Sequence, residues 1–277
     1  MEGRDWLVIS RGTAPLVVSI PHSGTDLPPA IEARLASPWI ARKDTDWWVD
    51  RLYECAAGLG ATMLRTQLSR TVIDLNRDPT GAPLYPGQIT TALCPATTFD
   101  GEPLYRDGQE PDAGESAERR QHYFEPYHAA LDAELARLRT MQANVVLYDA
   151  HSIPSRVPHL FDGELPHLNI GTNSGRSCAP RLTARIEAVC NGSDYTYVTN
   201  GRFKGGYITR HHGRPERGVH AVQMELACSG YLREPGPPLN AGNWPVPYDA
   251  ARAAPLRAVL QDILVACIEF ARDDGED

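Results

Sequence analysis

Two histidines, His22 and His151, each follow a short apolar run and are each followed by serine. Residues 16–20 (LVVSI) precede the first histidine, and residues 144–148 (NVVLY) precede the second. Short apolar runs without clean alternation indicate strands that are covered on both faces of a parallel or mixed sheet. Ligands of open α/β sheets bind outside the carboxyl ends of the strands, so both histidines are expected in one pocket. Two histidines and a carboxylate form a recurrent catalytic zinc site.

The third zinc ligand is expected to be an aspartate. Asp46 is favoured and Asp44 is next, although either one alone could simply cap the helix that follows. Asp149 lies two positions before His151, on the same side of an extended chain, and could orient that ring by a hydrogen bond on the side away from the metal. The carboxylates considered for the ligand position are Asp26, Asp44, Asp46 and Asp50.

Glu225 lies near the end of a third predicted strand, residues 219–226, whose other face is apolar. Burial at such a position raises the pKa of a glutamate and suits it to act as a general base. The alternative is an ordinary exposed glutamate on an edge strand.

Polar and basic side chains flank another predicted strand, residues 70–75: Arg70, Asn76 and Arg77. Because the formal net charge is −8, an anionic ligand would need such local positive groups, and a clamp for a substrate carboxylate is plausible here. Residues 200–213 are glycine-rich and basic, but their spacing matches neither a P-loop nor a dinucleotide-binding fingerprint. A Gly-x-Ser-x-Gly elbow is also missing, which argues against a serine hydrolase.

Strands alternate with segments of helical periodicity along the chain. This alternation predicts an α/β fold, a three-layer sandwich with a mixed, mostly parallel sheet between helices, formed as one domain over residues 1–277. Residues 80–114, rich in Pro, Gly and Thr, predict a long active-site loop, and residues 153–177 a second polar loop. The remaining predicted strands are 61–66 and 196–199, and the predicted helices are 44–59, 124–138, 182–189 and 256–268.

Composition restricts the class of partner. The net charge of −8 argues against a nucleic-acid partner, which would require a basic face. No apolar run approaches the roughly 18 residues that cross a bilayer, so no membrane partner is expected. The charged N-terminus lacks a signal-like apolar stretch, and a cytoplasmic location is expected. The six cysteines form no Cys-x-x-Cys pair, which leaves no zinc-ribbon or redox motif.

Several segments taken together resemble the N-formylglutamate amidohydrolase (N-formylglutamate deformylase) family of histidine breakdown. They extend from near residue 16 to about residue 232. The matching segments are residues 21–28 (PHSGTDLP), 44–47 (DTDW), 69–77 (SRTVIDLNR), 84–87 (LYPG), 149–152 (DAHS), 161–163 (FDG), 200–211 (NGRFKGGYITRH) and 223–226 (QMEL).

The resemblance implies a zinc-dependent amidohydrolase, similar in fold to zinc carboxypeptidases, that converts N-formyl-L-glutamate to formate and L-glutamate. One Zn²⁺ per chain would be held by His22, by Asp46 or Asp44, and by His151. Glu225 would match the catalytic glutamate, and the substrate-facing positions would be Arg70, Asn76 and Arg77.

A hydrolytic mechanism follows as a hypothesis. Glu225 would take a proton from water and return it to the departing amine, while Arg70 or His211 would stabilise the oxyanion. Arg77 and Arg210 would hold the two carboxylates of a small-molecule substrate. The alternatives are a zinc amidohydrolase for another N-acyl acidic amino acid and a non-catalytic sensor of acidic metabolites.

Overall fold

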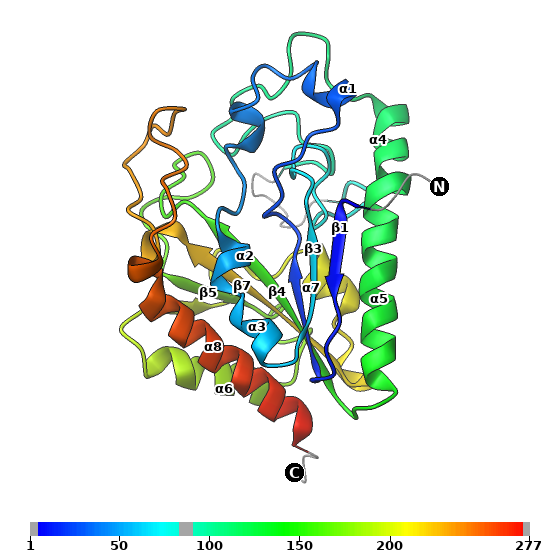
Figure 1. The fold of residues 1–277 in the computed structure, drawn as a ribbon, viewed down its shortest axis with the longest axis vertical. Coiled ribbons are helices and arrows are strands. Elements are labelled where there is room, and N and C mark those ends of the chain that lie inside the picture. Colours follow the sequence, from blue (N-terminus) through cyan, green and yellow to red (C-terminus); the bar gives the residue numbers. More distant parts are fainter. Residues whose placement is uncertain (1–4, 83–90, 274–277) are drawn as a thin grey trace.

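The computed structural model describes residues 5–82 and 91–273, and a seven-stranded mixed sheet crosses its centre (Figure 1). The strand order is β1-β3-β2-β4-β7-β5-β6. Strands β3, β2, β4 and β7 are parallel neighbours, and β1 and β5 are antiparallel to β3 and β7. The predicted α/β class with a mixed sheet is therefore confirmed. The strands are β1 (Leu7–Ser10), β2 (Leu16–Ile20), β3 (Thr62–Thr66), β4 (Val145–Ile153), β5 (Leu168–Gly171), β6 (Tyr197–Thr199) and β7 (Val219–Ala227).

Helices cover both faces of this sheet. The helices α6 and α8, together with the short α2 and α3, pack on one face, and α5 and α7 pack on the other (Figure 1). The helices are α1 (Pro29–Glu32), α2 (Val49–Leu52), α3 (Cys55–Gly58), α4 (Ala113–Arg119), α5 (Glu125–Arg139), α6 (Pro180–Asn191), α7 (Tyr207–His212) and α8 (Ala250–Arg272), and a π-helical turn, Arg120–Phe124, joins α4 to α5. Within the described residues, no helix is both long and apolar enough to span a membrane.

The face that packs against α5 and α7 changes character along the three central strands. Near the start of each strand this face carries core residues, among them Val17, Leu147 and Ala221. Side chains two or four positions later lie on the same face, because side chains alternate along a strand. These later positions are polar and buried: Ser19 on β2, Asp149 and His151 on β4, and Gln223 and Glu225 on β7. The sequence thus places a polar pocket at the carboxyl end of an otherwise apolar sheet.

The predicted strand over residues 70–75 is wrong. The segment forms turns, because its hydrogen-bonding groups find partners outside any sheet. Val72 N donates to Ser69 O, Thr71 Oγ1 donates to Ala41 O, and Asp74 N donates to Leu93 O. The β-branched residues of this segment are buried in the core, but they do not pair with a neighbouring strand.

The single helix predicted over residues 44–59 is instead two short helices, α2 and α3. Trp48, which precedes α2, has a left-handed backbone (φ 66°) and makes no side-chain cap. Asp44 and Asp46 therefore do not cap this helix. Their side chains form hydrogen bonds elsewhere, as described below.

Other boundaries also differ from the prediction. His151 lies inside β4 and not after its end, because β4 pairs with β7 over nine consecutive residues. Strands β1 and β5 and helix α7 were not predicted, and β5 lies inside the predicted polar loop 153–177.

Part of the predicted active-site loop, residues 83–90, lies outside the described residues, and so does the matched segment 84–87. The described part of the loop ends at α4 and is irregular, with isolated bridges from Thr97 to Pro103 and from Leu35 to Tyr105. Phe99 and Tyr105 are buried, so this part packs against the body of the protein.

Candidate active site

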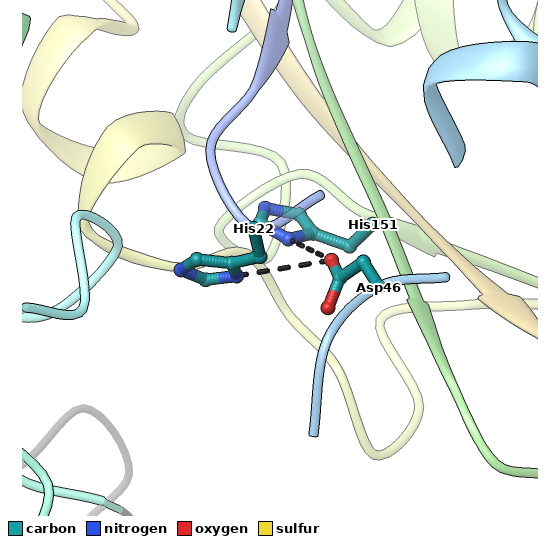
Figure 2. A group of neighbouring side chains, drawn as sticks. All are labelled: His22, Asp46 and His151. Atoms are coloured by element: carbon teal, nitrogen blue, oxygen red, sulfur yellow. Dashed lines mark hydrogen bonds and ion pairs between the residues drawn. The ribbon is translucent and has the colours of Figure 1, made fainter. Parts of the chain in front are cut away.

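His22, Asp46 and His151 converge in the polar pocket, although they come from three separate segments (Figure 2). His22 follows β2, Asp46 precedes α2, and His151 lies on β4. One potential ligand atom from each lies within 4.8 Å of the others, and all three side chains are buried. Asp46 Oδ2 lies 3.1 Å from His151 Nδ1 and 3.8 Å from His22 Nδ1. The backbone fixes this arrangement, because Asp46 N donates to His22 O.

A carboxylate lies behind each imidazole. His22 Nε2 lies 2.9 Å from Asp74 Oδ1, and His151 Nε2 lies 3.0 Å from Asp149 Oδ2. A carboxylate only accepts hydrogen bonds, so His22 Nε2 carries a proton and, in a neutral ring, His22 Nδ1 presents a lone pair toward Asp46. His151 lies between two carboxylates, and its Nδ1 donates to Asp46 unless a metal ion takes the place of that proton. Such carboxylate–histidine pairs are typical of metal-binding imidazoles.

The pocket needs a positive charge between these groups. Within the described residues, His22 Nδ1 is buried and makes no hydrogen bond. Burial and the charge of Arg70 lower the pKa of His22, which keeps its ring neutral at pH 7. Burial alone would lower the pKa of His151, but Asp149 and Asp46 raise it well above its usual value. A cation at this point, a metal ion or a proton, would satisfy all three groups.

The other aspartates considered for the ligand position point elsewhere. Asp44 Oδ2 accepts a 2.7 Å hydrogen bond from Phe99 N, and burial raises the pKa of Asp44 to about 7. Asp50 pairs with Arg65 on β3 at 3.7 Å, and Asp26 lies in a backbone bridge with Leu68. Of the four candidates, Asp46 alone joins the two histidines, as the sequence favoured.

Glu225 faces the same pocket from β7, where its backbone is in register with that of His151. Burial raises the pKa of Glu225 to about 7. Gln223 Nε2 donates to Glu225 Oε2 at 3.0 Å, and Gln223 Oε1 accepts from Gly206 N at 2.7 Å. Because the Gly206 N–H can only donate, it fixes the orientation of the amide and leaves its NH₂ for Glu225.

Three polar residues after β3 surround the histidines. Arg70 donates to Asp46 Oδ1 at 3.3 Å and to Asp74 Oδ2 at 2.6 Å, so it holds both carboxylates in place. Asn76 Nδ2 donates to Asp149 Oδ2 at 3.0 Å and lies 2.9 Å from His151 Nε2. Arg77 Nε donates to Thr91 O at 3.2 Å.

Both charged and apolar side chains line the pocket. Residues contributed by at least five separate segments line it: His22, Arg70, Asn76, Arg77, Thr91, Phe99, His151, Ile153, Leu160, Arg202, Phe203, Gly206, Gln223 and Glu225. Burial alone would raise the pKa of Asp74, but the charges of Arg77, His22 and Arg70 hold it well below its usual value. A small anionic molecule would find three arginines and a glutamate here.

Comparison with known proteins places the chain among hydrolases. The profile of the N-formylglutamate amidohydrolase family matches residues 14–232. The chain belongs to this family. It is 48% identical over 268 residues to an N-formylglutamate deformylase of Pseudomonas aeruginosa, covering 96% of this chain and 97% of the relative. It is 44% identical over 272 residues to an N-formylglutamate deformylase of Pseudomonas putida, with the same coverage.

A solved member of the family has the same fold. The crystal structure of an N-formylglutamate amidohydrolase from Ralstonia eutropha JMP134 superposes with a TM-score of 0.75 at 26% identity, covering 96% of this chain and 98% of that one. The family named from the sequence is thereby confirmed.

Two predicted site residues of this family member lie apart from the pocket. Arg210 and His211 lie on α7 and are absent from the residues that line the pocket. Arg210 Nε donates to Gly205 O at 2.8 Å, and the His211 ring stacks on Tyr207 at 4.7 Å. Their predicted roles, a carboxylate clamp and an oxyanion donor, find no support in this geometry.

Sequence reasoning missed several residues of the pocket. Asp74 was read as part of a strand, and Gln223 only as one residue of a matching segment. Arg202 lines the pocket. It belongs to the same basic segment as Arg210, the arginine that was predicted to hold a substrate carboxylate. A Cβ on Gly206 would lie 2.4 Å from the Asn76 amide, which explains the requirement for glycine at this position.

Proposed function

We propose that this protein hydrolyses N-formyl-L-glutamate to formate and L-glutamate, as the last step of a histidine degradation route. One observation carries the proposal. In a chain of the N-formylglutamate amidohydrolase family, two imidazoles, a carboxylate and a buried glutamate meet in one pocket with arginines. The substrate is taken from the names of the two relatives, both N-formylglutamate deformylases. The pocket contains the metal-binding, basic and cationic groups that hydrolysis of this substrate needs.

The residues fit a single zinc ion. His22 Nδ1, His151 Nδ1 and Asp46 Oδ2 would hold it, which is the two-histidine, one-carboxylate set of catalytic zinc sites. The unpaired His22 Nδ1 and the carboxylates behind both rings support this assignment. When bound, zinc would lower the pKa of a water molecule and polarise the formyl carbonyl.

Glu225 then acts as the general base and acid. Its carboxylate takes a proton from the attacking water, whose oxygen bonds to the formyl carbon. As the C–N bond breaks, Glu225 returns the proton to the nitrogen, so that formate and the amine of L-glutamate are released. The Gln223 amide holds the carboxylate in position through Oε2.

Arginines supply the attraction for the two substrate carboxylates. Arg77 and Arg202 line the pocket, and they are the proposed clamps, with Arg202 in the place first given to Arg210. Arg70 is held between Asp46 and Asp74, so its main role is to fix the metal-binding carboxylates. It still lines the pocket and can reach a developing oxyanion.

The direct test is formate release from N-formyl-L-glutamate, measured before and after chelation and again after zinc is restored. We expect turnover that chelation abolishes and zinc recovers. A panel with N-formyl-L-aspartate and N-formyl-L-leucine tests the substrate class. N-formyl-L-leucine keeps the α-carboxylate but has an apolar side chain, so one of the two half-buried clamp arginines loses its substrate partner and this compound should react much more slowly. Equal rates on all three compounds would contradict the proposal.

The pH dependence of the reaction should report Glu225. The base form is required and its pKa is about 7, so kcat/KM should rise about tenfold per unit below that pH and then level off. A neighbouring cation favours the ionised carboxylate and moves the inflection to lower pH. Gln223→Leu removes the donor to Oε2 and should move the inflection to higher pH. A rate that falls as pH rises through this range would oppose the assignment.

Replacement of Arg77 tests the carboxylate clamp. A hydrogen bond to a charged group contributes about 1.5–3 kcal/mol, so Arg77→Ala should raise KM roughly 10- to 100-fold. We expect a smaller fall in kcat, which reflects loss of the 3.6 Å ion pair between Arg77 and Asp74, the carboxylate behind His22. Steady-state kinetics measures both constants. Arg77→Lys keeps the charge but loses the paired donors, and should give an intermediate KM.

A further inference from the structure

A second group of potential metal ligands lies outside the pocket, between α5 and α7. Within the described residues, Asp132, His211 and His212 each offer one ligand atom, and these atoms lie within 4.8 Å of one another. Asp132 comes from α5, and the two histidines end α7. The Asp132 side chain is 63% exposed and that of His212 is 1% exposed, so the group opens to solvent on one side only.

The hydrogen bonds of a neighbouring histidine determine the tautomer of His212. His128 Nε2 lies 3.0 Å from Leu75 O, and a carbonyl only accepts, so this nitrogen carries a proton. The Nδ1 of a neutral His128 ring then has a lone pair, and it accepts the 2.9 Å hydrogen bond from His212 Nε2.

This arrangement leaves the other nitrogen of His212 without a proton when the ring is neutral. His212 Nδ1 lies 2.9 Å from Asp132 Oδ1, so a lone pair faces a carboxylate oxygen. His151 Nδ1 likewise lies 3.1 Å from Asp46 Oδ2 in the pocket. In His212 the neighbouring His128 occupies Nε2, so a positive charge, a proton or a metal ion, is needed between Nδ1 and Asp132.

A proton could supply that charge, but a proton needs only two partners. Here a third ligand converges, because a ring nitrogen of His211 lies within 4.8 Å of the other two atoms. Stacking on Tyr207 at 4.7 Å holds this ring in place.

The geometry assigns to Asp132, His211 and His212 a second metal site, separate from the proposed catalytic one. Two imidazoles and a carboxylate suit a divalent transition ion such as Zn²⁺, Ni²⁺ or Cu²⁺, and disfavour Mg²⁺ and Ca²⁺. A bound ion would connect α5 to α7. The latter helix also holds Asn76, since Ile208 N donates to Asn76 Oδ1 at 2.8 Å. Asn76 in turn lies 2.9 Å from His151 Nε2, so α7 connects the second site to the residues around His151.

Metal binding to the chelator-treated full-length protein tests this assignment independently of any enzymatic activity. Zn²⁺ is titrated in competition with a chromophoric chelator at pH 7.5. We expect two equivalents in the parent and one in His211→Gln or Asp132→Asn. The equivalent that remains should be the one that His151→Ala removes. Asp132 and His211 are both exposed, so the variants should fold like the parent. Circular dichroism spectra of the variants check their folding.

The matched control is His122→Gln, which removes another exposed histidine, outside this group. It should keep both equivalents. Bound Zn²⁺ should also raise the melting temperature of the His151→Ala protein, and this shift should vanish when His211→Gln is added. A parent that binds a single equivalent, or a second equivalent that survives both His211→Gln and Asp132→Asn, would overturn the assignment.

Discussion

Replacing Glu225 by glutamine is expected to lower kcat by about 10²- to 10⁴-fold, the range over which general acid–base catalysis contributes. The substitution keeps the size of the side chain and its place on β7, but the amide cannot take a proton from water. Zinc content should remain that of the parent, because Glu225 lies outside the proposed ligand set. Formate release and metal analysis of the same preparation measure both quantities.

Glu234→Gln is the matched control for that substitution. Glu234 is another partly buried glutamate, and burial raises its pKa as well, but it lies in a different pocket near Ser155. Its replacement should leave kcat near that of the parent. If the Glu225→Gln protein turned over at the parent's rate, Glu225 would not be the base. If the parent also held no zinc and released no formate, a non-catalytic sensor would become the better explanation.

The central part of the site could be predicted from sequence because strand geometry determines it. Residues at the carboxyl ends of parallel strands share one sheet edge, so His22 and His151 were expected to meet. Alternation along β4 placed Asp149 on the same side as His151, and the structure confirms their 3.0 Å contact. These inferences depend only on local patterns and on a general rule of sheet topology.

Residues in turns could not be predicted in the same way. The segment that contains Asp74 has a strand-like composition, yet Ser69 and Thr71 bond to the distant Ala41 O and hold it in a turn. No local pattern encodes such a partner. Helix α7 was not predicted either, because Gly205 and Gly206 directly precede its first residue, Tyr207. Arg210 was therefore predicted to face the substrate, whereas in the structure it lies on this helix and Arg202 lines the pocket.

Replacing His151 by alanine is expected to remove both zinc and activity, with a fall in kcat at least as large as that caused by Glu225→Gln. His151 Nδ1 is one of three proposed ligand atoms, and the two that remain, on His22 and Asp46, are fewer than the three protein ligands of catalytic zinc sites. The truncation also leaves Asp149 without its 3.0 Å partner in a buried position. Metal analysis after dialysis against buffer without zinc measures the first effect, and formate release measures the second.

The control for that truncation must separate loss of a ligand from loss of a buried side chain. His220→Ala serves, because His220 is a buried histidine at the opposite end of the same sheet, near the start of β7. It should lower the melting temperature through the cavity it leaves, yet retain zinc and most of the activity. Asp149→Asn offers a graded test, since loss of a carboxylate behind a metal-binding imidazole costs about 10- to 100-fold in metal affinity. Stoichiometric zinc in the His151→Ala protein would remove His151 from the ligand set, and the mechanism would then need another third ligand.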